Sequence, residues 1–148
     1  PPTAIKVLDA KDLSAMAPEA FAGFKAAQIQ ALPPAAVSAL GAMQLNQLPP
    51  TAFKAMGASL IQKLPTQAFA GITPEQLSQL APKALKAFDP KDLGAMAPEA
   101  FAGLKTSQAK TLTIDQLKAL SPEQVDAIPD NVINALSAAQ KAVIEQIK

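Results

Sequence analysis

The chain has 148 residues, a formal net charge of +1 and 49% hydrophobic residues, which is enough for one domain with a buried core. It contains no histidine, cysteine, tyrosine or tryptophan, so disulfides and thiolate metal sites are excluded. Nucleic acid is not expected as a partner, because its binding sites combine a basic stripe with aromatic or arginine side chains. No apolar run reaches the ~18–20 residues that a spanning helix needs, and no membrane insertion is expected.

An eight-residue repeat runs through the whole chain. Written from residue 1, the sequence divides into eighteen units without insertion or deletion, beginning PPTAIKVL and ending SAAQKAVI. The eighth residue of every unit is apolar, from Leu8 to Ile144. Internal repetition of this kind predicts a single repeat array over residues 1–148.

Two kinds of unit alternate along the array. The fourth residue is Ala in most odd-numbered units, such as Ala52, and Gln or Asp in most even-numbered units, such as Gln44. We therefore expect an all-α solenoid of very short helices, paired into sixteen-residue turns and coiled right-handed. About nine such turns, at 8–10 Å between helix layers, predict a rod roughly 70–90 Å long.

The first elements in chain order are the unit at Pro1 and the unit at Asp9. The array opens at Pro1 directly in register, with Ala4 in the fourth place. In the second unit Asp9 is an expected helix N-cap, and Asp12 lies at the third helical position, where a carboxylate is also favourable.

The unit at residues 89–96 repeats this pattern with Asp89 and Asp92. Two carboxylates this close could instead act as an acid–base pair or share a calcium ion. Calcium needs six to eight oxygen ligands, however, and no ligand-rich loop lies nearby. We predict helix capping for both pairs, and no metal site.

Glutamine follows a cap in the units that begin at Thr73 and Ser121. Both residues are expected N-caps, with a proline at the first helical position. Gln76 and Gln124 fall at the third helical position and can reach back to the cap, which is the capping-box arrangement. The glutamine series could also form a ladder that recognises a ligand, but capping and hydrogen bonding between stacked turns is the favoured interpretation.

Residues five and eight of each unit lie three apart and therefore share one helix face. Phenylalanines in the fifth place of odd-numbered units are expected to form a column along the core, and Gly23, Gly71 and Gly103 to allow close packing. The predicted core residues are Phe21, Phe53, Phe69, Phe101, Leu40, Leu80 and Leu120. At the end of the chain, residues 137–148 lack proline and are expected to form a longer, capping helix.

The units TPEQLSQL, TIDQLKAL and SPEQVDAI, together with APEAFAGL, resemble the tandem LTxxQ(V/L)xAL octapeptide arrays of very large bacterial adhesin-like surface proteins. The resemblance covers essentially the whole chain and rests on the repeat pattern. More distantly, the chain is similar to the Pro- and Leu-rich helical repeats of the mesothelin–stereocilin group. These resemblances imply an extracellular or cell-surface role and carry over no catalytic residue.

Catalysis is not expected, because the usual bases, nucleophiles and metal ligands are missing and the repeat never breaks to make room for a site. No cofactor is expected either. The favoured function is a structural segment, a stalk, spacer or scaffold, of a larger cell-surface or secreted protein. The alternative is a protein- or peptide-binding module that uses an exposed face or groove. A protein partner or self-association and a cytoplasmic location all stay open.

Overall fold

The computed structural model describes residues 7–148, and this part of the chain is helical without strands. The expectations about Pro1 and Ala4 lie outside the described residues. The helices are short, between four and six residues each, except for a final one of ten. They are α2 (Ala10–Ala15), η1 (Pro18–Gly23), α3 (Ala26–Gln30), α4 (Pro34–Val37), α5 (Ala42–Asn46), α6 (Pro50–Phe53), α7 (Ala58–Ile61), η2 (Thr66–Gly71), α8 (Pro74–Gln79), α9 (Pro82–Lys86), α10 (Pro90–Gly94), η3 (Pro98–Gly103), α11 (Thr106–Ala109), α12 (Ile114–Lys118), α13 (Pro122–Ala127), α14 (Asp130–Asn134) and α15 (Ala138–Ile147).

Each unit from residue 9 onward forms one helix, and the limits of that helix follow from the first two residues and the last residue of the unit. In α8, Thr73 is the N-cap and Pro74 takes the first helical position, where the missing N–H of proline costs nothing. The helix ends at Leu80, which is extended and donates its backbone N–H to Leu77. Because the next unit starts with another cap or proline, the helix cannot continue.

Three units form 3-10 helices, a difference that the repeat pattern did not predict. These are η1, η2 and η3, and all three contain the sequence Ala-Phe-Ala-Gly. The unit of α6 has Phe53 in the same place but is followed by Lys54 and Ala55, and it is α-helical. Glycine near the helix end disfavours α-helix, and 3-10 geometry is common in pieces this short.

The chain returns beside itself after three to four units. Helix α5 packs on η2, α8 on η3, and α12 on α15, each pair being three units apart. Hydrogen bonds from glutamine side chains span slightly more, 28 to 31 residues. Contacts between helices two units apart are recorded in the described chain between α13 and α15, at its C-terminal end.

The expected pairing of units into sixteen-residue turns is therefore wrong. The short extended linkers turn the chain by less than half a circle between successive helices, so two units do not complete a turn. The sixteen-residue period instead describes how the two kinds of unit alternate along the sequence, and it is not the length of a turn. Units three apart are of opposite kind and units four apart are of the same kind, and the alternation suits both sets of neighbours.

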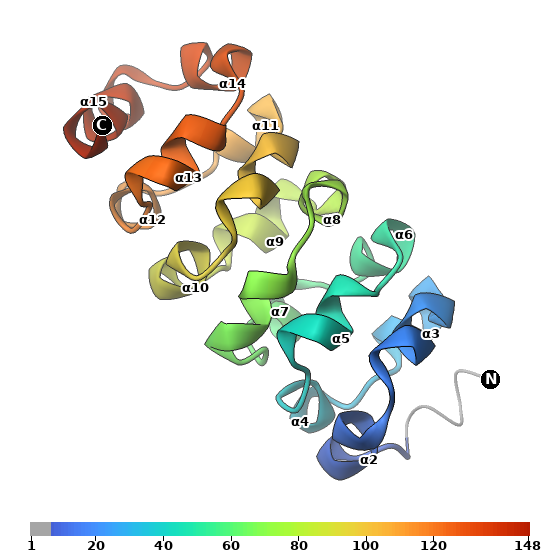
Figure 1. The fold of residues 1–148 in the computed structure, drawn as a ribbon. Coiled ribbons are helices and arrows are strands. Elements are labelled where there is room, and N and C mark those ends of the chain that lie inside the picture. Colours follow the sequence, from blue (N-terminus) through green and yellow to red (C-terminus); the bar gives the residue numbers. More distant parts are fainter. Residues whose placement is uncertain (1–6) are drawn as a thin grey trace.

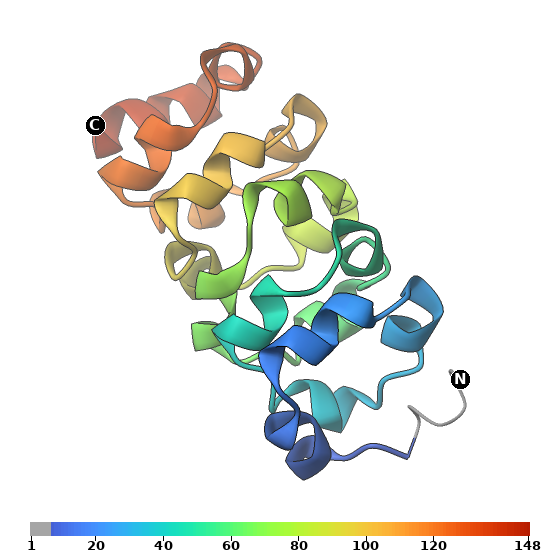
Figure 2. The same cartoon turned by 45° about the vertical axis from the view of Figure 1, so that its right-hand side comes forward.

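The helices stack from α2 at one end of the described chain to α15 at the other (Figures 1 and 2). With three to four units per return, the seventeen units from α2 to α15 make about five layers instead of nine, and the stack is correspondingly shorter than the slender rod expected. The accessible surface of 7182 Å² agrees, since a compact protein of 15.3 kDa exposes roughly 7,100 Å².

The apolar fifth and eighth residues of the units form one continuous core. Phe21, Phe53, Phe69 and Phe101 are at most 1% exposed, and the predicted core leucines are also buried: Leu40, Leu80 and Leu120. The recorded ring pairs are Phe21 with Phe24, at 5.0 Å between centroids, and Phe69 with Phe88, at 4.9 Å. In these pairs a fifth-position ring meets an eighth-position ring, which differs from the expected single column of fifth-position rings.

The final helix α15 starts after the N-cap Ser137 and ends before Lys148. Val143 and Ile144 are buried, whereas Lys141 and Glu145 are exposed. This longer helix covers the end of the core and presents a polar face outward.

Candidate functional site

The most regular polar feature is a set of glutamines at the third helical position. In each case the side-chain Oε1 accepts the backbone N–H of the residue at the helix cap. Thr73 donates to Gln76 at 2.9 Å and Ser121 donates to Gln124 at 2.8 Å. The cap hydroxyls complete the exchange by accepting the backbone N–H of the same glutamines, at 3.1 and 3.2 Å.

The other end of each glutamine amide reaches a different unit. Nε2 of Gln76 donates to the carbonyl oxygens of Leu45, Asn46 and Leu48, at 2.8, 3.3 and 2.9 Å. These carbonyls belong to the end of α5 and the residues just after it, where the last helix carbonyls run short of intrahelical partners; that of Leu45 also accepts the backbone N–H of Leu48. One amide therefore satisfies the start of its own helix and the end of the helix four units earlier.

Six glutamines make such cross-unit bonds at the same offsets of 31 and 28 residues: Gln44, Gln76, Gln108, Gln116, Gln124 and Gln140. We call these six the bridging glutamines, and four of them lie at intervals of 32 residues: Gln44, Gln76, Gln108 and Gln140. All six side chains are buried. Their amides already bond the backbone, which supports capping and inter-unit bonding over a ladder that recognises a ligand.

The two aspartate pairs differ from each other. Asp9 and Asp12 make the expected reciprocal capping box, with bonds of 3.0 and 2.8 Å. Asp89 is also an N-cap, but its carboxylate accepts the N–H of Lys91 at 3.1 Å. Asp92 makes no return bond to the cap, so the capping role predicted for the second pair applies to Asp89 alone.

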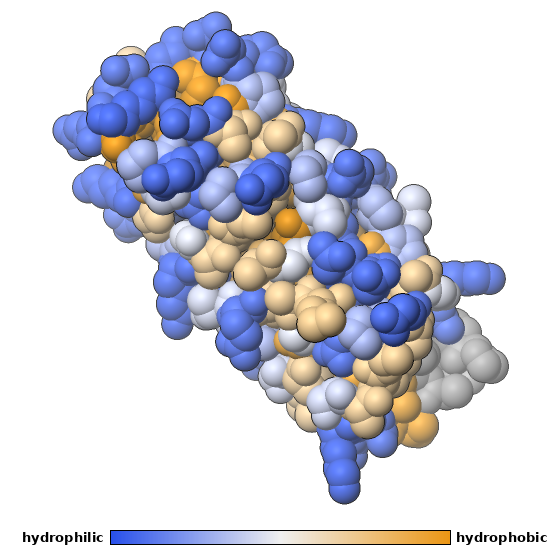
Figure 3. Space-filling view, in the orientation of Figure 1, coloured by the Kyte–Doolittle hydropathy of each residue, from blue (hydrophilic) through white to orange (hydrophobic). Residues whose placement is uncertain are grey.

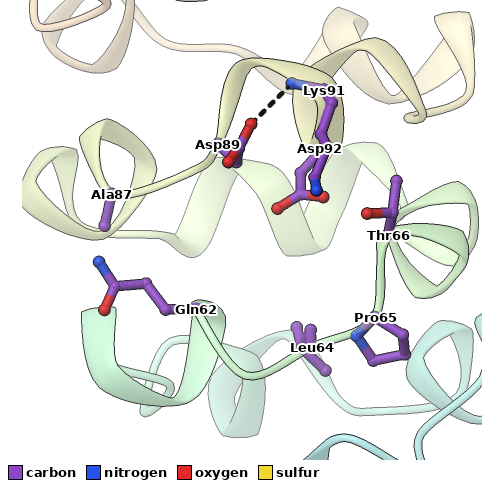
Figure 4. Close-up of a pocket in the computed structure, with 8 residues that line it drawn as sticks. All are labelled: Gln62, Leu64, Pro65, Thr66, Ala87, Asp89, Lys91 and Asp92. Atoms are coloured by element: carbon purple, nitrogen blue, oxygen red, sulfur yellow. Dashed lines mark hydrogen bonds between the residues drawn. The ribbon is translucent and has the colours of Figure 1, made fainter.

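Asp92 instead lies buried at the wall of a cavity. Its side chain is 8% exposed, and its Oδ1 is buried without a hydrogen-bond partner. The cavity has a volume of about 370 Å³ and is also lined by Gln62, Leu64, Thr66 and Asp89. Figure 4 shows the carboxylate of Asp92 pointing into this space, across from the chain that follows α7.

Two of the three glycines predicted to allow close packing do so. A Cβ on Gly71 would overlap the backbone carbonyl of Ala42, and one on Gly103 would overlap that of Pro74. These contacts bring η2 against α5 and η3 against α8. Gly23 occupies the same place in η1, but nothing lies within 4 Å of its Cβ position.

The surface has no dominant apolar area on the face drawn in Figure 3, where hydrophilic and apolar residues alternate. Among residues 7–148, no three acidic, histidine or cysteine side chains converge as metal ligands. The described helices are also too short or too polar for any of them to cross a bilayer.

No protein-family model matches the chain, and no curated protein is significantly similar to it. The repeat pattern could not reveal the position of Asp92 opposite α7, because the residues around it come from a unit about thirty positions earlier. One signal was available: Asp92 takes a place that glutamine fills in most even-numbered units.

Proposed function

We propose that the chain is an α-solenoid segment with three to four units per turn, acting as a spacer or scaffold in a larger cell-surface or secreted protein. The observation that supports this most is the set of glutamine bridges. Seven buried polar or charged side chains are recorded in the described core, and six are the bridging glutamines. Nearly all the buried polar side chains therefore join units to one another, and few are left that could bind a substrate.

A spacer must hold its ends at a fixed separation, and two features favour this. Six units bond the backbone of the unit four places earlier through a buried glutamine amide, and the core is continuous between the units. Unfolding one unit would leave carbonyls of another without partners, at about 1–3 kcal/mol for each buried group. Neighbouring units thus stabilise each other, as in other repeat proteins.

Distance measurements between spin labels test the spacer directly. The chain has no cysteine, so labels attach only at introduced ones, and Lys11, Lys54 and Glu145 are exposed positions near the start, middle and end. The proposal predicts one narrow distance distribution for each of the three pairs, unchanged on warming below the unfolding transition. Broad or multiple distributions for the Lys11–Glu145 pair would contradict a spacer role.

A second candidate function is peptide or protein binding, and one observation favours it. Met43 is 73% exposed and borders a groove of about 300 Å³ between η1, α5 and η2. Flexible methionines are common at binding surfaces. Selecting a displayed peptide library on the wild-type chain and on Met43→Lys tests this, since peptides held by the groove should be lost on the variant. Recovery of the same peptides on both proteins would argue against the groove.

A further inference from the structure

Asp92 and Leu60 interrupt the series of bridging glutamines in the even-numbered units between Gln44 and Gln140, and of the two only Asp92 is polar. Four units later, Nε2 of Gln124 donates to the carbonyls of Leu93, Gly94 and Met96, which lie in the unit of Asp92 and at its end. The same offsets of 31, 30 and 28 residues, counted back from Asp92, lead to Ile61, Gln62 and Leu64. These three residues form the end of α7 and the linker after it.

Aspartate in the place of glutamine replaces a hydrogen-bond donor with an acceptor at this junction. A glutamine presents an N–H donor to the carbonyl oxygens, whereas an aspartate presents a carboxylate oxygen, which accepts. Because Gln62 and Leu64 line the same cavity as Asp92, we infer that their carbonyl oxygens and the carboxylate lie on opposite sides of it, where a cation can neutralise the oxygens of both sides. The buried Oδ1 of Asp92, which has no partner, is the group this arrangement leaves unsatisfied.

The surrounding residues add further oxygen ligands. Thr66 lines the same cavity with its hydroxyl, and so does Asp89, whose Oδ1 is occupied by the N–H of Lys91. Lys91 is the cationic side chain among the lining residues, but it makes no hydrogen bond to the buried Oδ1. Backbone carbonyls, one or two carboxylates and a hydroxyl, completed by water, are the mixed oxygen set that Ca²⁺ accepts in flexible geometry.

We propose that this junction binds one calcium ion, held by the carboxylate of Asp92 and by the backbone carbonyls of Gln62 and Leu64, which follow α7 and line the cavity. The ion takes the place of the missing glutamine amide and joins the unit at residues 89–96 to the unit at residues 57–64. Within residues 7–148, Asp92 of α10 is the buried carboxylate recorded with an unpartnered oxygen. Asp12 has the same sequence position, but it is exposed and bonds its own cap.

Calorimetric titration of the full chain with CaCl2, with thermal unfolding in parallel, tests the site. A site of the affinity typical of extracellular calcium modules, with a dissociation constant of 10⁻⁴–10⁻³ M, should bind one ion per chain. In ~10 mM CaCl2 the unfolding equilibrium constant should then fall about 10- to 100-fold. MgCl2 should act more weakly, because Mg²⁺ demands small octahedral geometry and keeps its waters.

The variant Asp92→Gln separates the site from general effects of salt. It restores the amide found at the equivalent junctions, so it should fold, be more stable than the parent in EDTA and give no calcium response. Asp12→Asn is the matched control and should keep the full response. The proposal is overturned by the absence of calcium binding to the parent chain, by an equal response in Asp92→Gln, or by an equal response to Mg²⁺.

Discussion

The side-chain Nε2 of Gln76 donates to the backbone carbonyl of Leu45 across 2.8 Å, although the two residues are thirty-one positions apart. The same amide caps its own helix by accepting the N–H of Thr73. This one side chain joins the start of α8 to the end of α5, and five further glutamines repeat the arrangement.

Replacing Gln76 with alanine should destabilise the chain more than replacing Gln28. Gln76 bonds its cap and three carbonyls of another unit, whereas the bond recorded for Gln28 among the described residues is the local one from Lys25. Unsatisfied buried carbonyls cost about 1–3 kcal/mol, so we expect a difference of roughly 2–3 kcal/mol between the variants. Urea unfolding monitored by circular dichroism measures it, and equal losses would mean that the cross-unit bonds contribute nothing.

Gly71→Ala should be destabilising, whereas Gly23→Ala should be tolerated. The two glycines hold the same place in their units, but a Cβ on Gly71 would overlap the carbonyl of Ala42 while Gly23 has open space. Overpacking of this kind costs about 1–3 kcal/mol. At an unstrained site the same change stabilises by about 0.4–1 kcal/mol, through the unfolded state. The melting temperatures of the two variants should therefore move in opposite directions, and a parallel shift would refute the close contact.

Phe101→Ala should lower the free energy of unfolding by about 3–5 kcal/mol, as expected for removing a fully buried aromatic side chain. The residue is 1% exposed in the middle of the stack. Met43→Ala is the control, since that side chain is 73% exposed and should change stability by less than ~0.5 kcal/mol. Parent-like unfolding of Phe101→Ala in urea would show that this part of the core is not packed as described.

Deleting residues 49–64 should be tolerated better than deleting residues 49–56. Removing two units keeps odd-numbered and even-numbered units in their alternating neighbourhoods, because units three apart remain of opposite kind. Removing one unit makes them the same kind at the junction, and η2 then lies three units after α4, which belongs to an odd-numbered unit, in place of α5, on which it packs. We expect the longer deletion to unfold cooperatively and the shorter one to lose helical ellipticity per residue, both measured by circular dichroism. Cooperative unfolding of both would contradict the role assigned to the alternation.

The local features could be predicted from the sequence because they depend on neighbouring residues. Thr73 and Ser121 cap their helices as expected, since a cap needs only the residue three positions on. The buried fifth and eighth positions also follow directly from the period of eight. The number of units per turn could not be predicted, because it depends on the angles of the short linkers, and no residue pattern specifies those angles.

The same distinction separates the two aspartate pairs. Asp9 and Asp12 behave as their spacing predicts, because Asp12 is exposed and has only its own cap to bond. Asp92 has the same spacing from Asp89, but its environment is built by residues about thirty positions earlier. Its burial could therefore be seen only once the units were placed in space.

The return of the chain after three to four units is the central claim, and spin-label broadening tests it most directly. Lys86, Ala102 and Lys110 are all exposed and hold the sixth place of their units. Labels at Lys86 and Lys110, three units apart, should lie at the ends of the packed helices α9 and α11, about 8–10 Å apart, and give strong dipolar broadening. Labels at Lys86 and Ala102, two units apart, should give little. The opposite result, strong broadening for the sixteen-residue pair alone, would restore the sixteen-residue turn and contradict this structure.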